Sequence, residues 1–122
     1  MSKSTTVNFV AKGNLPDEWR MVLVEEGPWH GQIDDQLRRI QGRMYGCIDA
    51  ALDGQLAEDF PESKGRRVVI QLDCYNVPRD EVEGFFSRFS EGVFELEDYR
   101  HALESNAFVK DIEFEINFDN IH

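Results

Sequence analysis

The residues that could do chemistry in this 122-residue chain are three histidines, two cysteines and many carboxylates. His30, His101 and His122 show no HxxxH, HExxH or His–Cys spacing, so the sequence predicts no metal site. Cys47 falls in a predicted helix and Cys74 in a predicted strand, and the sequence shows no nearby base that would activate either thiol. The carboxylates are so numerous that no pair of them is diagnostic of acid–base catalysis.

The chain also lacks the glycine and nucleophile motifs of common enzymes. It contains no GxxxxGK[ST], GxGxxG or GxSxG sequence. Gly42 and Gly46 lie four residues apart inside a predicted helix, where they would allow something to pack closely. The sequence therefore favours a non-catalytic protein without a cofactor over an enzyme.

The charge is concentrated at one end of the chain. Residues 79–122 hold twelve acidic and four basic residues, which accounts for −8 of the net charge of −11. Like charge repels phosphate, so this balance argues against direct binding of nucleic acid. An acidic surface would instead attract a basic protein partner, although the simpler interpretation is that the acidity only keeps the protein soluble. The candidate partner-binding residues are Glu95, Glu97, Asp98, Asp111, Glu113 and Glu115.

Length and composition indicate one globular domain spanning residues 1–122. A hydrophobic content of 41 %, with nine Phe, argues against disorder. No apolar run approaches the ~20 residues that span a bilayer, and the first ten residues lack the apolar core of a signal peptide. Two isolated cysteines make no disulfide framework. We therefore expect a soluble, cytoplasmic protein that does not bind membranes.

The stretch from Gln32 to Phe60 contains the clearest predicted helix. Apolar residues recur there at spacings of three and four, which is the pattern of an amphipathic helix. Gly54 is expected to follow the helix as its C′ residue. Two pairs at i, i+4, Asp34–Arg38 and Asp35–Arg39, are expected on its solvated face. The expected buried stripe is Ile33, Leu37, Ile40, Met44, Cys47 or Ile48, and Ala51.

The remaining elements are four strands and two further helices. The first two strands should form an antiparallel hairpin around turn residues Gly13-Asn14 and Pro16-Asp17. A helix opening at Val77-Pro78 should bury Val82, Phe85, Phe86 and Phe89. The predicted strands are Val7–Ala11, Glu18–Glu26, Arg67–Tyr75 and Phe108–Phe118, and a short helix is predicted at Glu97–Glu104.

This order, ββαβα(α)β, predicts an α+β fold. The simplest arrangement is a two-layer sandwich with about four strands in the sheet and two main helices on one face. On the final strand, alternation places Ile112, Phe114, Ile116 and Phe118 in the core and Asp111, Glu113, Glu115 and Asn117 on the open face. The charges of Glu113 and Glu115 are expected to add on that face without neutralisation by neighbouring bases.

Several of these residues carry a resemblance to a known group of proteins. The series Ile48–Leu56, Phe60-Pro61, Gly65, Val68–Leu72 and Pro78 resembles a group of small bacterial proteins of unknown function. The likeness covers about residues 18–90, and Trp29, Leu37, Gln41 and Met44 fit that group's pattern of a Trp-containing turn followed by a helix. It implies an α/β fold with no known activity.

In size, acidity and absence of a catalytic motif, the chain is also similar to immunity proteins that neutralise polymorphic bacterial toxins, including those of contact-dependent growth inhibition. This likeness implies an acidic surface that caps a basic toxin, often a nuclease. The alternative is a stand-alone small protein that forms a homodimer or binds a small ligand in a pocket near Trp29, His30 and Tyr75.

Overall fold

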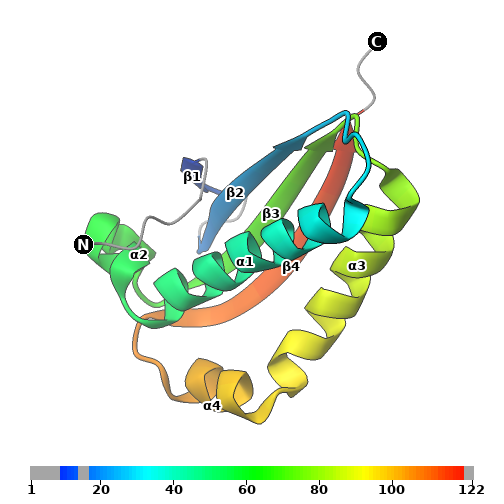
Figure 1. Cartoon of the computed structure of the whole chain (residues 1–122). Helices are drawn as coiled ribbons and strands as arrows, with labels where there is room; N and C mark the ends of the chain where they lie inside the picture. Colours follow the sequence, from blue (N-terminus) through cyan, green and yellow to red (C-terminus); the bar gives the residue numbers. More distant parts are fainter. Residues whose placement is uncertain (1–8, 14–16, 120–122) are drawn as a thin grey trace, which may run out of the picture.

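The computed structural model of the chain describes residues 9–13 and 17–119. Within these residues the four predicted strands and three predicted helices are present (Figure 1). A short helix after Gly54 and two 3-10 turns are additional elements that the sequence does not predict. The α+β class is confirmed. In chain order the elements are β1 (Phe9–Lys12), β2 (Glu18–Glu26), α1 (Ile33–Leu52), α2 (Gln55–Asp59), η1 (Pro61–Ser63), β3 (Arg66–Tyr75), α3 (Arg79–Gly92), η2 (Val93–Glu95), α4 (Glu97–Ser105) and β4 (Val109–Asp119).

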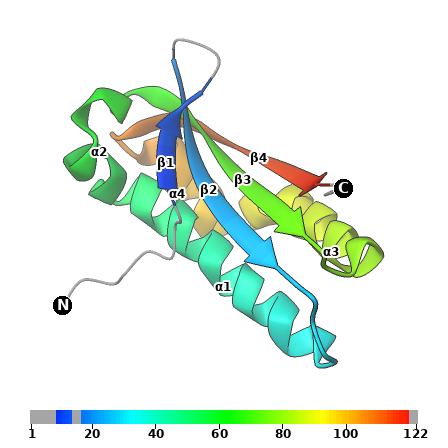
Figure 2. The same ribbon diagram turned by 90° about the horizontal axis from the view of Figure 1, so that it is seen from above.

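The strands form one mixed sheet in the order β1-β2-β3-β4. β1 runs antiparallel to β2, whereas β2, β3 and β4 are mutually parallel (Figure 2). The predicted antiparallel hairpin of the first two strands is thus confirmed. Val7 and the turn residues Asn14 and Pro16, which also belonged to that prediction, lie outside the described residues.

Two successive crossovers decide which face the helices cover. Connections between parallel strands are almost always right-handed. The β2-α1-β3 and β3-α3-β4 units advance across the sheet in the same direction, so right-handed crossovers place α1 and α3 on the same face. Figure 1 shows both helices on that face, with α4 beyond the end of α3. The predicted two-layer arrangement is therefore confirmed.

The core lies between this helical layer and alternate residues of the strands. The predicted stripe of α1 is buried from Ile40 onwards, and Leu37 packs partly buried against the same core. In α3, Val82, Phe86 and Phe89 are buried and Phe85 is half-buried. The strands contribute Met21 and Leu23 from β2, Val68, Ile70, Leu72 and Cys74 from β3, and Val109 and Ile112 from β4.

The inward face of β4 is less buried than the sequence predicts. Ile112 is buried, but Phe114, Ile116 and Phe118 are only half-buried against the core. The reason is topological, because β4 is an edge strand whose neighbour in the sheet lies on one side only. The ring of Phe114 is nevertheless enclosed by three other aromatic rings, with centroid distances of 6.4 Å to Phe86, 6.0 Å to Phe89 and 6.0 Å to Phe94.

Gly54 has the role that the sequence predicts for it. It follows the C-cap of α1 in a left-handed conformation with φ of 95°, which favours glycine at a helix end. A β-carbon at this position would lie 2.8 Å from the ring of Phe108. Both the backbone conformation and the close packing therefore require glycine here.

A buried carboxylate fastens α1 to the sheet. Glu25 lies on the core side of β2 and is 2 % exposed. Arg39 donates to both of its oxygens, at 2.6 and 2.9 Å. Arg43 donates to Oε2 of Glu25 and, at 3.0 Å, to the carbonyl of Val24. The two positive charges compensate a carboxylate that would otherwise be costly to bury.

This contact overturns a pairing that the sequence favours. Arg39 does not pair with Asp35 in the structure, because it is committed to Glu25. Arg38 contacts Asp35 at 3.4 Å instead of Asp34. A solvated i, i+4 pair is worth only about 0.3–0.5 kcal/mol, which is too little to compete with a buried carboxylate for the same guanidinium.

Replacing Phe114 by Ala should destabilise the fold by about 3 kcal/mol, the lower end of the range for Phe→Ala, because the site is half-buried at a sheet edge. Urea-induced unfolding would measure this. Leu96→Ala, at a position that is 50 % exposed, should cost far less. Equal effects of the two substitutions would contradict the assignment of Phe114 to the core.

Replacing Glu25 by Gln should cost about 3–5 kcal/mol, since it leaves Arg43 partly buried without its counter-charge. The matched control is Asp35→Asn, which breaks an exposed pair and should change the free energy of unfolding by less than about 0.5 kcal/mol. If thermal and urea unfolding gave similar values for both variants, α1 would not depend on Glu25.

Candidate functional site

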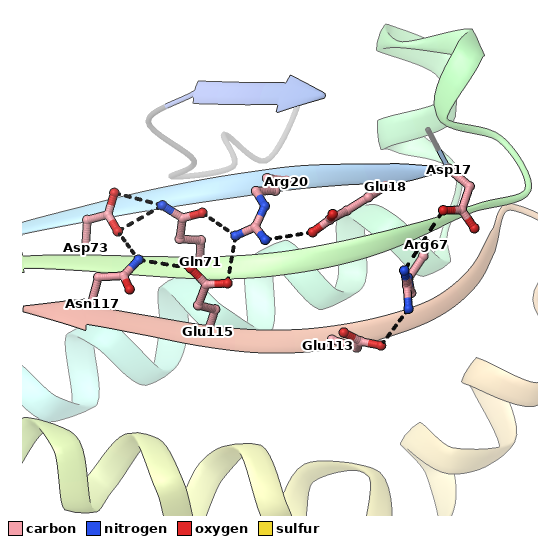
Figure 3. A network of polar contacts seen from close by, with 9 residues as sticks. All are labelled: Asp17, Glu18, Arg20, Arg67, Gln71, Asp73, Glu113, Glu115 and Asn117. Atoms are coloured by element: carbon pink, nitrogen blue, oxygen red, sulfur yellow. Dashed lines mark hydrogen bonds and ion pairs between the residues drawn. The ribbon is translucent and has the colours of Figure 1, made fainter. Parts of the chain in front are cut away.

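The open face of the sheet carries a network of polar side chains centred on Arg20 (Figure 3). Its guanidinium contacts Glu18 on its own strand at 2.7 Å, Gln71 of β3 at 2.7 Å and Glu115 of β4 at 2.9 Å. One arginine thus ties three strands together and neutralises carboxylates from two of them.

The network continues along β3 and β4. Nε2 of Gln71 donates to both carboxylate oxygens of Asp73, at 2.9 and 3.0 Å. Nδ2 of Asn117 donates to Asp73 at 3.0 Å and to Glu115 at 3.1 Å. The carboxylates on this part of the face therefore accept hydrogen bonds from neighbouring side chains.

A second arginine compensates the other end of β4. Arg67 contacts Glu113 at 3.3 Å and approaches Asp17 at 4.0 Å. Lys110 also approaches Asp17, at 3.8 Å. The expectation that the charges of Glu113 and Glu115 would add without neutralising bases is therefore wrong: each has an arginine beside it. Neither arginine could be assigned from sequence spacing, because they lie 95 and 46 residues away.

The pairing on the open face shifts the pKa of two groups. The hydrogen bond from Arg20 lowers the pKa of Glu115, a second hydrogen bond from Asn117 acts the same way, and partial burial opposes both. For Arg20, burial acts to lower the pKa, but the hydrogen bonds and charges of Glu115 and Glu18 outweigh it and raise the pKa. Both groups are thus held in their charged forms.

The six candidate carboxylates fall into two groups. Glu113, Glu115 and Asp111 lie on β4, where the half-buried Asp111 accepts a hydrogen bond from the backbone N–H of Ile112 at 2.9 Å. Glu95, Glu97 and Asp98 lie on η2 and the first turn of α4, and all three are exposed. Within the described residues, the side chains of these last three make no hydrogen bond or ion pair. Glu95, Glu97 and Asp98 are called the α4 acidic surface below.

The structure itself supplies a local reason for part of this surface. Glu97 and Asp98 stand in the first turn of α4, where the positive end of the helix dipole stabilises negative charge. The one arginine of α4, Arg100, forms no ion pair within the described part of the chain. The helix therefore stabilises these charges, and no ion pair holds them within the described residues, although Arg100 lines the same hollow as Glu97 and Asp98.

A hollow of about 410 Å³ beside α4 extends the acidic character onto α1. Its lining combines Asp49, Asp53 and Asp98 with the apolar side chains of Leu52 and Ala102 and the ring of Tyr99. The Tyr99 hydroxyl donates to Asp49 at 3.3 Å, and burial, together with Asp49 and Tyr45, raises the pKa of Tyr99 to about 12. Asp49 and Asp53 are not among the residues that the sequence predicts for this surface, because they lie at the C-terminal end of α1, far along the chain from the acidic C-terminal third.

The residues of the alternative pocket are not brought together on one face. Trp29 packs partly buried against the core, and its Nε1 is buried without a hydrogen-bond partner in the described residues. Tyr75 shares the strand face of Gln71 and Asp73, which is the opposite, open face. His30 is exposed.

Gly42 and Gly46 stand on the outer side of α1. A β-carbon at either position would meet nothing within 4 Å. Nothing in the described chain packs against them, so the close packing that the sequence predicts is not made within the described residues. In a helix interior each glycine costs about 1 kcal/mol relative to alanine.

The cysteines and histidines show no arrangement for chemistry in the described residues. Burial raises the pKa of Cys47 to about 12, and burial with the charges of Glu25 and Asp73 raises the pKa of Cys74 to about 12. Both thiols are therefore protonated at neutral pH. Within residues 9–13 and 17–119, no group of three or more His, Cys, Asp or Glu side chains is placed to hold a metal ion; His122 lies outside these ranges.

Over the same residues, no helix combines the length and apolarity that crossing a membrane would require. Comparisons with protein-family models, curated proteins and solved structures found no match. The arrangement of charges on the surface is therefore the main guide to function.

Titration of Glu115 should reveal the pairing on the open face. We expect NMR of its side-chain carboxyl to give a pKa below the usual value of about 4.3, and Arg20→Met to raise it. Because the folded-state pKa lies below the unfolded one, the stabilisation from Glu115 is complete above about pH 5 and is lost as the pH falls through the folded-state pKa. The stability difference between the wild-type protein and Glu115→Gln should therefore shrink in acid. A pKa at or above the usual value would contradict the network.

Proposed function

We propose that this chain is a non-catalytic binding protein, an immunity-type inhibitor that captures a basic bacterial toxin in the cytoplasm through the α4 acidic surface. The observation that carries the proposal is the contrast between two sets of carboxylates. Glu113 and Glu115 are paired with arginines. The side chains of Glu95, Glu97 and Asp98, in contrast, are exposed and make no ion pair or hydrogen bond within the described residues.

Unpaired carboxylates suit the capture of a basic protein for a physical reason. A carboxylate already paired within the fold must break that pair before it can meet a new cation. A free carboxylate contributes its full field, which speeds and orients the encounter with an oppositely charged surface. A toxin that acts on nucleic acid must itself present Lys and Arg to phosphate, so its binding surface is a natural target for such a field.

The overall charge supports the same kind of partner. The net charge of −11 repels nucleic acid and attracts basic proteins. The likeness of the chain to immunity proteins in size and acidity agrees with this proposal. A gene for a secreted toxin directly upstream would strengthen it further, and would supply the partner for the following test.

Reversing the charge of the α4 acidic surface should weaken toxin binding about tenfold or more. The variant is the triple substitution Glu95→Lys, Glu97→Lys and Asp98→Lys. Titration calorimetry against the toxin domain encoded next to this chain would measure affinity at low and at physiological salt. The loss should be larger at low salt and should appear mainly in the association rate, because it arises from a screened, long-range field. Growth rescue in cells producing the toxin should fail in parallel.

Two controls separate local charge from total charge. Glu58→Lys, Asp59→Lys and Glu81→Lys together change the net charge equally at other exposed positions. Glu113→Gln with Glu115→Gln removes the paired carboxylates of β4. Both controls should bind with nearly wild-type affinity at physiological salt. Unchanged affinity of the α4 variant, or equal loss in the first control, would refute the proposal.

A further inference from the structure

An apolar groove lies on the outer side of the helical layer, next to the α4 acidic surface. It occupies about 290 Å³ between α1, the C-terminal half of α3 and η2. Most of its lining is aromatic or aliphatic: Tyr45 from α1, Phe85 and Phe89 from α3, Val93 from η2, and Leu96. Ring contacts of Tyr45 with Phe89 at 5.0 Å and of Phe85 with Phe89 at 6.2 Å hold the walls in place.

Leu96 stands at the rim of this groove and is 50 % exposed. The other exposed large apolar residue of the described chain, Phe60, contacts the ring of Trp19 in a tilted arrangement with centroids 5.7 Å apart. Leu96 lies between Glu95 and Glu97 in the sequence, so the groove and the acidic surface share a border.

Two glycines lie on α1 next to the side that lines the groove. Gly42 and Gly46 directly follow the lining residues Gln41 and Tyr45, which places them about 100° further round the helix, toward solvent. Because a β-carbon at either glycine would meet nothing within 4 Å, the fold itself gives no reason for glycine there. A strip without side chains would allow the backbone of another molecule to approach α1 closely.

The charges around the groove indicate what kind of molecule this is. Glu95, Glu97 and Asp98 surround Leu96 in the chain. The rings of Tyr45 and Tyr99 are in contact, with centroids 5.4 Å apart. Asp49, which accepts a hydrogen bond from Tyr99, lies on the far side of this contact. The lining contributes a single base, Arg88. An apolar site bordered by these carboxylates is complementary to an apolar side chain flanked by Lys or Arg.

We propose that this groove anchors a helical segment of the basic partner. A large apolar side chain of that segment enters the groove, its flanking Lys and Arg lie on the α4 acidic surface, and its backbone packs on Gly42 and Gly46. Helix-in-groove docking buries one apolar face and leaves basic residues free to meet the rim. This inference rests on the proposed function, since it names the anchor of a partner that the acidic surface attracts.

The test uses the full chain and a synthetic probe. The probe is a 20-residue helical peptide of Lys and Ala with one central Trp, and calorimetry and amide NMR shifts follow its binding. We expect saturable binding with the largest shifts at residues that line the groove. Replacing the Trp of the probe by Ala, or its Lys residues by Glu, should weaken binding at least tenfold.

Variants of the chain then distinguish the contribution of the groove to binding from the contribution of the α4 acidic surface. Leu96→Ser should weaken binding of the Trp probe at least tenfold, while Phe60→Ala should leave it unchanged. Gly42→Ala with Gly46→Ala should raise Tm and yet weaken binding, because the new methyl groups improve the helix but block close approach. Ser87→Ala, at an exposed position of α3 outside the groove lining, should also favour the helix without affecting binding.

Each other outcome has a definite meaning. Equal affinity of the Trp and Ala probes would refute the proposal that the groove anchors the partner. Unchanged affinity in both the Leu96 and the glycine variants would refute it as well. The α4 charge-reversal variant would in that case still weaken binding of the toxin domain if the proposed function is right. Absence of any saturable binding of the Trp probe would also refute docking in the groove. The titration with the toxin domain would still test the proposed function independently.

Discussion

Both parallel crossovers of the sheet advance in the same direction, and this constraint decides what each face of the sheet can do. Right-handed connections then place α1 and α3 on one face. Polar groups on the other face must find partners across the strands. Arg20 and Arg67 supply them, by contacting carboxylates from neighbouring strands. The open face consequently carries many acidic residues, but most of their charge is neutralised by arginines from neighbouring strands.

The same constraint explains why free carboxylates gather at the end of the helical layer. β4 must start beside the start of β3, so the chain has to run back along the sheet before it enters β4. α3 makes much of this return, and the η2–α4 segment joins its end to the start of β4 (Figure 1). No residue of α4 is fully buried. Its carboxylates therefore lie beyond the arginines of the open face. The charge available to a partner is set by topology more than by the count of acidic residues.

The local pattern is sufficient to predict the four strands and the helices α1, α3 and α4, but not α2 or the contacts between elements. Apolar spacing identified the buried stripe of α1, and alternation identified β3 and the inward side of β4. Three features could not be predicted because they depend on residues far apart in the chain: the attachment of Arg39 to Glu25, the neutralisation of Glu115 by Arg20, and the half-burial of Phe114 at an edge. The groove was missed for the same reason, since its walls come from α1, α3 and η2. The acidic composition of the C-terminal third indicates the candidate carboxylates. Only the pairing of the strands shows which of them have an arginine partner and which do not.

Three features of the helical layer oppose the stability of the isolated chain. Two helix glycines have no packing reason within the described residues, one leucine is half exposed, and neighbouring carboxylates repel one another. Each has a mild explanation when taken alone, as the α4 dipole shows for Glu97 and Asp98. Some comparable features are compensated internally: the Phe60 ring contacts Trp19, and Glu25 is held by two arginines. Others, such as the exposed neighbours Glu58 and Asp59, are not. A partner that buries Leu96, approaches the glycine strip and brings positive charge would offset all three at once.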